Sequence, residues 1–146
     1  MIAGVQIIPL KVIPDARGPV MRMLRADDPH FLGFGEVYFS CVAPGAIKGW
    51  RRHQRMVQNL AVPVGRVQIA LYDDRPGSAT RSEVQSVVIG PEVNYALVSI
   101  PPGVWNAFKG LAAQLSVVAN CATILHDPGE SETRPLDNPP VAFTWS

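Results

Sequence analysis

Short β-prone runs, each closed by a turn residue, constrain the fold of this chain more than any other sequence feature. Branched and aromatic residues gather in brief stretches, and Gly, Pro, Asn or Asp stands at the ends of each stretch. No segment carries a long helical period. The expected strands cover residues 4–13, 20–24, 35–42, 47–55, 57–64, 66–72, 84–89, 95–100, 115–123 and 141–145. We therefore predict an all-β sandwich or barrel.

The length and charge of the chain narrow its organisation and its partners. At 146 residues, we expect one domain over residues 1–146. The formal net charge is +1 and 17% of the residues are charged, so the chain lacks the basic balance of a nucleic-acid or membrane-surface binder. No apolar run approaches the roughly 18 residues of a membrane span, and no signal segment opens the chain. We expect a soluble, cytoplasmic protein.

The two cysteines, Cys41 and Cys121, both lie in apolar, strand-like runs. Free cysteines behave as small apolar residues, and disulfides are rare in the cytoplasm. We therefore expect two buried, reduced thiols.

Gly45 and Gly65 bracket three residues, Arg51, His53 and Gln58, at a distinctive spacing. The spacing resembles the first motif of the cupins, in which the three positions hold the metal ligands histidine, histidine and glutamate. A guanidinium has only donor hydrogens and stays protonated, so Arg51 cannot bind a metal ion. The stretch keeps the cupin frame without its metal chemistry.

A second stretch, residues 100–108, resembles the second cupin motif. There, a Pro-x-Gly turn leads into the fourth ligand position, which is Asn106 in this chain. An amide is a poor ligand for a transition metal. With three of the four ligand positions replaced, we expect no bound metal and no other cofactor.

Further motifs resemble the dTDP-4-dehydrorhamnose 3,5-epimerases. Residues 73–80 (DDRPGSAT) resemble the D-x-R-x-x-S-P-T signature of that family, and residues 15–18 (DARG) match its early D-x-R-G turn. Residues 48–51 match part of its R/K-G-x-H-x-Q motif, and residues 128–137 and 141–145 echo its last motifs. The motifs follow one another in the family's order over nearly the whole chain.

The resemblance implies a cupin jelly-roll barrel and a homodimer that exchanges N-terminal strands. It also implies that a nucleotide-diphosphate sugar binds in the barrel mouth. Arg17 takes the place of the turn arginine that reaches the nucleotide across the dimer in the family. The alternative for Arg17 is a solvated turn residue.

The family's acid and base residues are replaced in this chain. Carried over by position, the base histidine falls on Arg51, the lysine that stabilises the enolate falls on Gln58, and the tyrosine falls on Asn120. The aspartate that holds the histidine belongs to a segment beyond the last strand, and the sequence stops at Ser146. Each general acid or base supplies about 10²–10⁴-fold, so we expect the ordinary 3,5-epimerase reaction to be lost or very slow.

The inward-facing side chains of the central strand predict which groups the cavity contains in place of the family's acid and base residues. Because side chains alternate along a strand, residues 51, 53 and 55 share a face, and the cupin register points 51 and 53 inward. An inward arginine needs an anion or an acceptor. We expect Glu36, which shares a face with Tyr38 and Ser40 on a neighbouring strand, to pair with Arg51. A ligand carboxylate or phosphate is the alternative.

His53 is the only histidine of the central motif, and two interpretations stay open for it. It can be a relocated base, since imidazole titrates near neutrality, or a hydrogen-bonded core residue. We expect Trp50 and Trp105 to be packing residues. Asp73, Asp74 and Arg75 are expected to form a salt-bridged turn, with Asp73 on the site wall.

Two classes of function remain from the sequence. The first is a metal-independent epimerase or isomerase of a nucleotide-linked keto-sugar, with His53 and Tyr38 as catalytic residues. The second is a non-catalytic cupin that binds a sugar nucleotide or a small anion. The predicted ligand-binding residues are Arg17, Glu36, Lys48, Arg51, Gln58, Asp73, Asn106 and Asn120.

Overall fold

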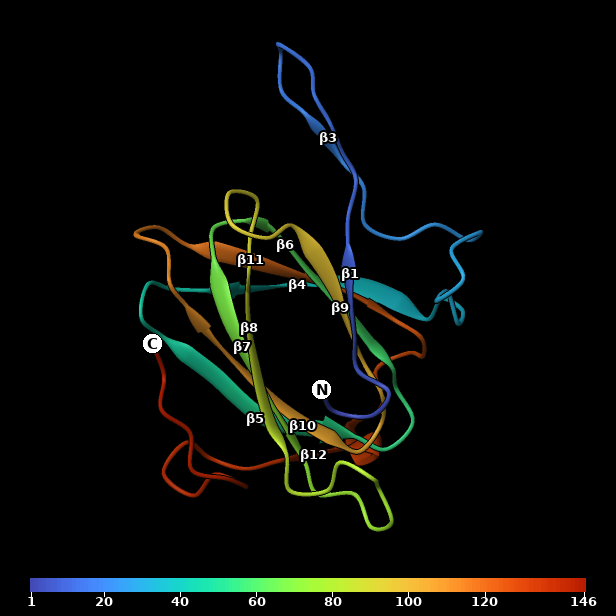
Figure 1. Cartoon of the computed structure of the whole chain (residues 1–146), viewed down its shortest axis with the longest axis vertical. Coiled ribbons are helices and arrows are strands. Elements are labelled where there is room, and N and C mark those ends of the chain that lie inside the picture. The colour runs from blue at the N-terminus through green and yellow to red at the C-terminus, as the bar shows by residue number, and fades with distance from the viewer.

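The computed structural model describes residues 1–146 and contains two five-stranded antiparallel sheets that face each other (Figure 1). Sheet I has the order β1-β9-β6-β11-β4, with β1 (Gln6–Pro9), β4 (Glu36–Val42), β6 (Gln58–Val64), β9 (Ala96–Ile100) and β11 (Ser116–Ala122). Sheet II has the order β12-β5-β10-β7-β8, with β5 (Ile47–His53), β7 (Val67–Asp73), β8 (Val84–Ile89), β10 (Val104–Gly110) and β12 (Ser131–Thr133). The structure is the single-domain jelly roll predicted from the sequence.

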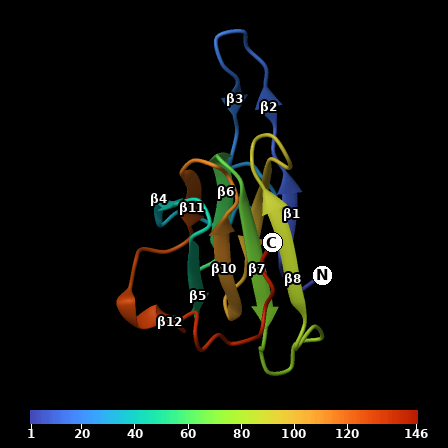
Figure 2. The same ribbon diagram turned by 90° about the vertical axis from the view of Figure 1, so that its left-hand side faces the viewer.

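A third, two-stranded element stands apart from the sandwich. β2 (Val12–Ile13) and β3 (Val20–Met21) form a hairpin that projects beyond one end of the two sheets (Figure 2). The expected strand over residues 4–13 is therefore divided. Its first part, β1, pairs with β9 of the same chain, and its second part enters the hairpin.

The alternation of side chains along the strands builds the core between the sheets. Leu60 and Val62 of β6 face Ile69 and Leu71 of β7, and all four are at most 2% exposed. Each strand turns these apolar side chains toward the opposite sheet because successive side chains point to opposite faces. This core fills one part of the sandwich, and polar side chains line the remaining part.

A second cluster covers the outer face of sheet II. Trp50 and Trp105 pack there with Ala70 and Ala107, as expected for packing residues, beneath the C-terminal segment. The predicted strand over residues 141–145 is wrong. The segment is extended, and its residues alternate between half-buried and exposed, but its backbone pairs with no strand.

Two strands of sheet II were not predicted. β10 is central, between β5 and β7, but its sequence VWNAFKG interrupts the β-prone residues with Asn, Lys and Gly. β12 is a three-residue polar edge strand with the sequence SET. It pairs with β5, which is distant along the chain, and local sequence pattern does not reveal such long-range pairing.

The expected burial of Cys41 is wrong, because Cys41 is exposed. It points outward from β4, which is the edge strand of sheet I, and an edge strand has a neighbour on one side only. Cys121 is half-buried, and burial raises the pKa of its thiol. Both cysteines are free thiols, and the expectation of no disulfide is confirmed.

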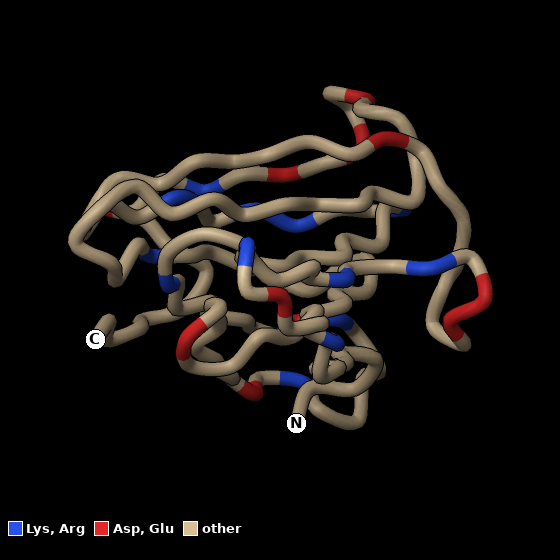
Figure 3. Tube along the Cα trace, turned by 90° about the horizontal axis from the view of Figure 1, so that it is seen from above, with Lys and Arg blue, Asp and Glu red and all other residues tan.

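Charged residues pair locally around the loops. Lys and Arg segments lie beside Asp and Glu segments at several turns (Figure 3), and the ion pairs include Arg17–Asp15, Arg25–Asp27 and Arg75–Asp73. The one helical segment, the 3₁₀ turn η1 (Pro128–Glu130), has three residues. The chain has no helix with the length and apolarity needed to cross a membrane.

Candidate functional site

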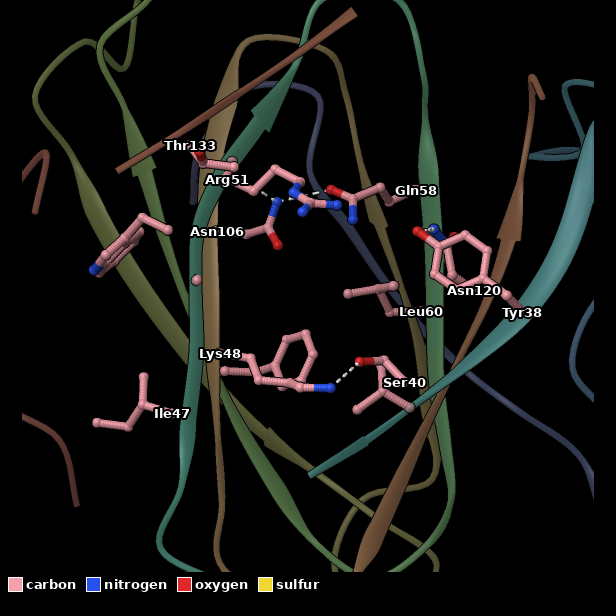
Figure 4. A pocket seen from close by; sticks show the side chains of 14 residues that line it. Tyr38, Ser40, Ile47, Lys48, Arg51, Gln58, Leu60, Asn106, Asn120 and Thr133 are labelled. Carbon is pink, nitrogen blue, oxygen red and sulfur yellow. Dashed lines mark hydrogen bonds between the residues drawn. The ribbon is translucent and has the colours of Figure 1, made fainter. Parts of the chain in front are cut away.

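A cavity of about 410 Å³ lies between the two sheets, walled by β4, β6 and β11 on one side and by β5 and β10 on the other (Figure 4). Leu60, Phe108 and Val118 give it apolar surface. The volume is within the range of ligand pockets, roughly 300–1,000 Å³. Six of the predicted site residues line this cavity, namely Tyr38, Lys48, Arg51, Gln58, Asn106 and Asn120.

The register of β5 against β10 places two cations on the same wall of the cavity. Lys48 lies opposite Phe108, and Arg51 lies opposite Asn106, with a register shift between Asn106 and Ala107. Phe108 and Asn106 are two residues apart and share a face, so their partners Lys48 and Arg51 share that face although they are three residues apart. Strict alternation would have placed Lys48 and Arg51 on opposite faces.

Arg51 has no anionic partner within the chain. Its side chain is exposed to the cavity, and it forms no hydrogen bond or ion pair with another residue; only its backbone oxygen accepts a bond, from Asn106 Nδ2 at 3.2 Å. The expected pair between Arg51 and Glu36 is wrong. The Glu36 carboxylate accepts from the backbone N–H of His126 at 2.6 Å and does not line the cavity. A loop amide therefore satisfies Glu36, and Arg51 is left for a ligand.

Tyr38 and Asn120 form a polar pair on the wall of sheet I. Asn120 Nδ2 donates to the Tyr38 hydroxyl at 2.9 Å, and Asn120 Oδ1 accepts from the backbone N–H of Asn59 at 3.0 Å. Asn120 is only 2% exposed, so its amide is held in one orientation. Because Asn120 donates to the phenol oxygen, the hydroxyl hydrogen of Tyr38 is free to be donated into the cavity.

Gln58 and Asn106 close the cavity near Arg51. Asn106 Nδ2 donates to Gln58 Oε1 at 2.7 Å, and both side chains are buried. Amides at the former metal-ligand positions thus bind each other instead of a cation. No group of three or more His, Cys, Asp or Glu side chains gathers anywhere in the chain in a way suited to a metal ion.

Lys48 crosses the cavity from sheet II to β4. Its amine donates to Ser40 Oγ at 3.0 Å and to the backbone oxygen of Cys41 at 2.8 Å (Figure 4). Both acceptors are neutral, and no carboxylate pairs with Lys48. Thr133 of β12, which the sequence analysis did not single out, lies opposite Arg51 in the register and also lines the cavity.

His53 is buried behind the cavity, where it binds Glu130. Its Nδ1 contacts Glu130 Oε1, and the side chains of His53 and Glu130 are 5% and 3% exposed. Glu130 Oε2 accepts from the backbone N–H groups of Gln54, Arg55 and Met56 at 3.2, 3.0 and 3.1 Å. His53 does not line the cavity, so the geometry fits the hydrogen-bonded core residue rather than the relocated base.

Glu130 itself was not singled out from the sequence, although it belongs to residues 128–137, which echo one of the family's last motifs. Burial alone raises the pKa of a carboxyl, but the hydrogen bonds from His53 and from the Arg55 and Met56 amides bring the pKa of Glu130 below its usual value. The charged carboxylate fastens the turn between β5 and β6. This turn connects β5, which carries Arg51, to β6, which begins at Gln58.

Asp73 and Arg17 lie outside the cavity. Asp73 is fully buried and, as expected, forms a salt-bridged turn with Arg75, but the expectation that it lines the site wall is wrong because Arg75, Ser78 and Thr80 surround its carboxylate. Asp74, which was expected in the same turn, pairs instead with Arg52 of β5 at 2.7 Å. The hydrogen bonds from Arg75 hold the pKa of Asp73 well below its usual range. Arg17 binds Asp15 in the exposed turn of the projecting hairpin.

Two facing antiparallel sheets, with a ligand-sized cavity between them and three of the four motif ligand positions (Arg51, Gln58 and Asn106) at its wall, define a protein of the cupin class. The chain belongs to the dTDP-4-dehydrorhamnose 3,5-epimerase family, whose model matches residues 1–146. The family predicted from the sequence motifs is confirmed.

Individual relatives agree with this assignment. The chain is 31% identical over 149 residues to the probable low-salt glycan biosynthesis epimerase Agl13 of Haloferax volcanii, covering 99% of this chain and 95% of that protein. It is 45% identical to a dTDP sugar isomerase of Desulfovibrio desulfuricans G20, whose crystal structure matches with a TM-score of 0.95 over 99% of this chain and 92% of the other.

A more distant structure shows the same fold with a ligand. The dTDP-6-deoxy-D-glucose-3,5-epimerase RmlC of Legionella pneumophila, solved in complex with dTDP-4-keto-L-rhamnose, is 24% identical. Its TM-score is 0.76 over 88% of this chain and 71% of that chain. At this identity, the likeness establishes the shared fold.

Proposed function

We propose that this chain is a nucleotide-sugar epimerase or isomerase of carbohydrate biosynthesis whose acid and base residues differ from those usual in its family. One observation carries the proposal: the cavity holds two basic side chains, Lys48 and Arg51, and a phenol, Tyr38, with no Asp, Glu or His on its wall. A guanidinium without a carboxylate partner, such as that of Arg51, binds phosphate or a developing enolate. The family match and the epimerase relatives favour catalysis over the non-catalytic alternative.

The chemistry of such a reaction assigns roles to the cavity residues. Removing a proton from the carbon beside a ketone leaves a negative charge on the ketone oxygen. Arg51 is the stabiliser of that oxygen, because its guanidinium is unpaired and Asn106 binds the Arg51 backbone. Tyr38 is the proton donor, since Asn120 fixes its oxygen and leaves its hydroxyl hydrogen available.

The exposed turn of the β2–β3 hairpin supports a role for Arg17 in the dimer expected from the sequence. The side chain of Arg17 is 90% exposed, and the hairpin projects away from its own sandwich (Figure 1). In the proposed homodimer, Arg17 contacts the nucleotide bound to the other protomer. Light scattering gives the molar mass in solution and so tests the proposed homodimer. Cell fractionation tests the predicted cytoplasmic location.

The test of the proposed reaction is hydrogen exchange. A dTDP-4-keto-6-deoxyhexose is incubated with the protein in D₂O, and deuterium at C3 and C5 is followed by NMR. We expect exchange with the wild-type chain and a loss of about 10²–10³-fold in Arg51→Ala, as for removal of an oxyanion donor. Arg81→Ala is the matched control, because Arg81 is exposed and lies outside the cavity.

The outcomes separate the two functions. Exchange that depends on Arg51 and not on Arg81 supports the epimerase or isomerase. Calorimetric binding of dTDP without any exchange contradicts catalysis and supports the binding protein instead.

A further inference from the structure

Inverting a carbon beside a ketone needs two proton carriers, one for each face of the planar enolate. Few residues on the cavity wall can carry a proton. Arg51 stays protonated, the amides of Gln58, Asn106 and Asn120 do not titrate, and the hydroxyls of Ser40 and Thr133 are very weak acids. Two groups that exchange protons in enzymes remain: the Tyr38 phenol and the Lys48 amine.

These two groups enter the cavity from different sheets. Tyr38 belongs to β4 in sheet I and Lys48 to β5 in sheet II, and their side chains approach the central space from different sides (Figure 4). The Lys48 amine reaches Ser40, which follows Tyr38 by two residues on the same face. Positions two apart on a strand are separated by roughly 6.5 Å. The amine at Ser40 and the phenol of Tyr38 therefore both border the cavity, which is the space in which a keto-sugar ring can lie.

The contacts of Lys48 suit an amine that accepts a proton. A neutral amine has two N–H hydrogens and one lone pair, and Lys48 Nζ has two acceptors within hydrogen-bond distance, Ser40 Oγ and the Cys41 oxygen. When the amine is neutral, those two acceptors take both of its N–H hydrogens, and its lone pair is the position left for the ligand. Arg52 and Arg75, by contrast, are both bound by carboxylates. No carboxylate pairs with Lys48.

We propose that Lys48 is a catalytic residue, the base that removes the proton while Tyr38 returns one on the opposite face. This inference rests on the proposed epimerase or isomerase function. The proton leaves the carbon beside the ketone for the Lys48 nitrogen, and the C–H electron pair forms the enolate, whose oxygen faces Arg51. Tyr38 donates its proton to the other face of that carbon. The ammonium then loses a proton to water and the phenolate regains one, so the chain is restored and the sugar keeps its composition.

The test uses three substitutions at Lys48 and one elsewhere. Lys48→Met removes the amine at similar length, Lys48→Arg keeps a positive charge that cannot act as a base, and Lys48→Ala opens room for an added amine. Lys11→Met is the control, since Lys11 is exposed and outside the cavity. Thermal unfolding and calorimetry with dTDP confirm that each variant is folded and binds nucleotide.

We expect Lys48→Met and Lys48→Arg to lower deuterium exchange by about 10²–10⁴-fold, the usual contribution of a general base, and Lys11→Met to leave it unchanged. Added primary amines should restore exchange in Lys48→Ala, with a rate that increases with amine basicity. Guanidine and tetramethylammonium should not restore it. A residue that merely anchors β4 would show no such dependence on amine basicity.

If Lys48→Arg exchanges deuterium at the wild-type rate, Lys48 is not the base. The same conclusion follows if Lys48→Ala is folded but stays inactive with every amine tested. Either result overturns the role of Lys48 and leaves the proposed function standing. Failure of the wild-type chain itself to exchange overturns both.

Discussion

The chain contains two Asp–Arg turns with the same hydrogen bonds, one buried and one exposed. Replacing Asp73 of the buried turn tests how much burial adds to the contribution of such a turn to stability. Asp73 accepts hydrogen bonds from Arg75 N, Nε and Nη2 at 3.0, 2.8 and 2.9 Å. Asp15 accepts the same three bonds from Arg17 at 2.9, 3.0 and 2.9 Å. Asp73 is 0% exposed, whereas the side chains of Asp15 and Arg17 are 34% and 90% exposed. The bonds are alike, and the surroundings differ.

The structure sets the magnitude for Asp73→Ala. Removing one partner of a buried ion pair costs about 3–5 kcal/mol, and Arg75 is 25% exposed, which favours the lower end. Ser78 and Thr80 also lose an acceptor at 2.7 Å each. We expect the free energy of unfolding to fall by about 3 kcal/mol. With a urea slope of about 2 kcal/mol/M, the midpoint falls by about 1.5 M.

The assay is urea denaturation followed by tryptophan fluorescence, with Asp15→Ala as the matched control. The exposed pair is screened by water, so Asp15→Ala should leave the midpoint unchanged within error. Equal shifts of the midpoint for Asp73→Ala and Asp15→Ala would refute the reasoning, because the contribution would then come from the turn geometry alone.

The pH dependence provides a second readout on Asp73. Because its pKa is lower in the folded than in the unfolded chain, the unfolded state binds more protons between the two values, and stability rises with pH there. The stabilisation is fully present above the unfolded pKa of about 3.9 and is lost as the pH falls below it. The stability difference between wild type and Asp73→Asn should therefore be constant near neutrality and shrink in acid.

Three further predictions concern buried Glu130, the C-terminal segment and the projecting hairpin. Glu130→Ala should lower the free energy of unfolding by about 3 kcal/mol in urea titrations, since it leaves buried His53 and three amides without their acceptor; a Glu130→Gln variant as unstable as Glu130→Ala would contradict the role of its oxygens as acceptors. Phe143→Ala should cost about 1–2 kcal/mol, because Phe143 is half-buried and packs edge-on against Trp50; an unchanged thermal midpoint would show that the C-terminal segment adds no stability. Arg17→Ala should weaken dTDP binding in calorimetry without changing the unfolding midpoint, and unchanged affinity would remove Arg17 from the site.

Local sequence pattern predicted a large part of the fold. Most expected strands match observed ones because inward apolar residues and bounding turn residues are local signals, as in β6 and β7. Side chains also alternate over residues 141–145, where Val141, Phe143 and Trp145 are half-buried against the outer face of sheet II. This alternation did not indicate backbone pairing, because the side-chain pattern is the same whether or not a neighbouring strand accepts the hydrogen bonds.

Motif positions predicted the family and five of the residues that line the cavity, and strand alternation predicted a sixth, Tyr38. Charge partners were less predictable. Arg51 and Glu36 were expected to form an ion pair, yet Glu36 accepts a hydrogen bond from a loop amide. The buried carboxylate that binds the central motif is Glu130, which pairs with His53. Such partners come from segments about 80 residues apart, and nothing local specifies them.

The sequence by itself determined that an arginine replaces the histidine of a cupin frame, because residue identity and spacing are written in the chain. Only the tertiary structure decided how Lys48, which was predicted to bind the ligand, comes to lie on the same face as Arg51. The two residues are three apart, and their common face comes from the register shift of β5 against β10. Register depends on how two strands pair across the sheet, so it is a property of the assembled fold rather than of either strand alone.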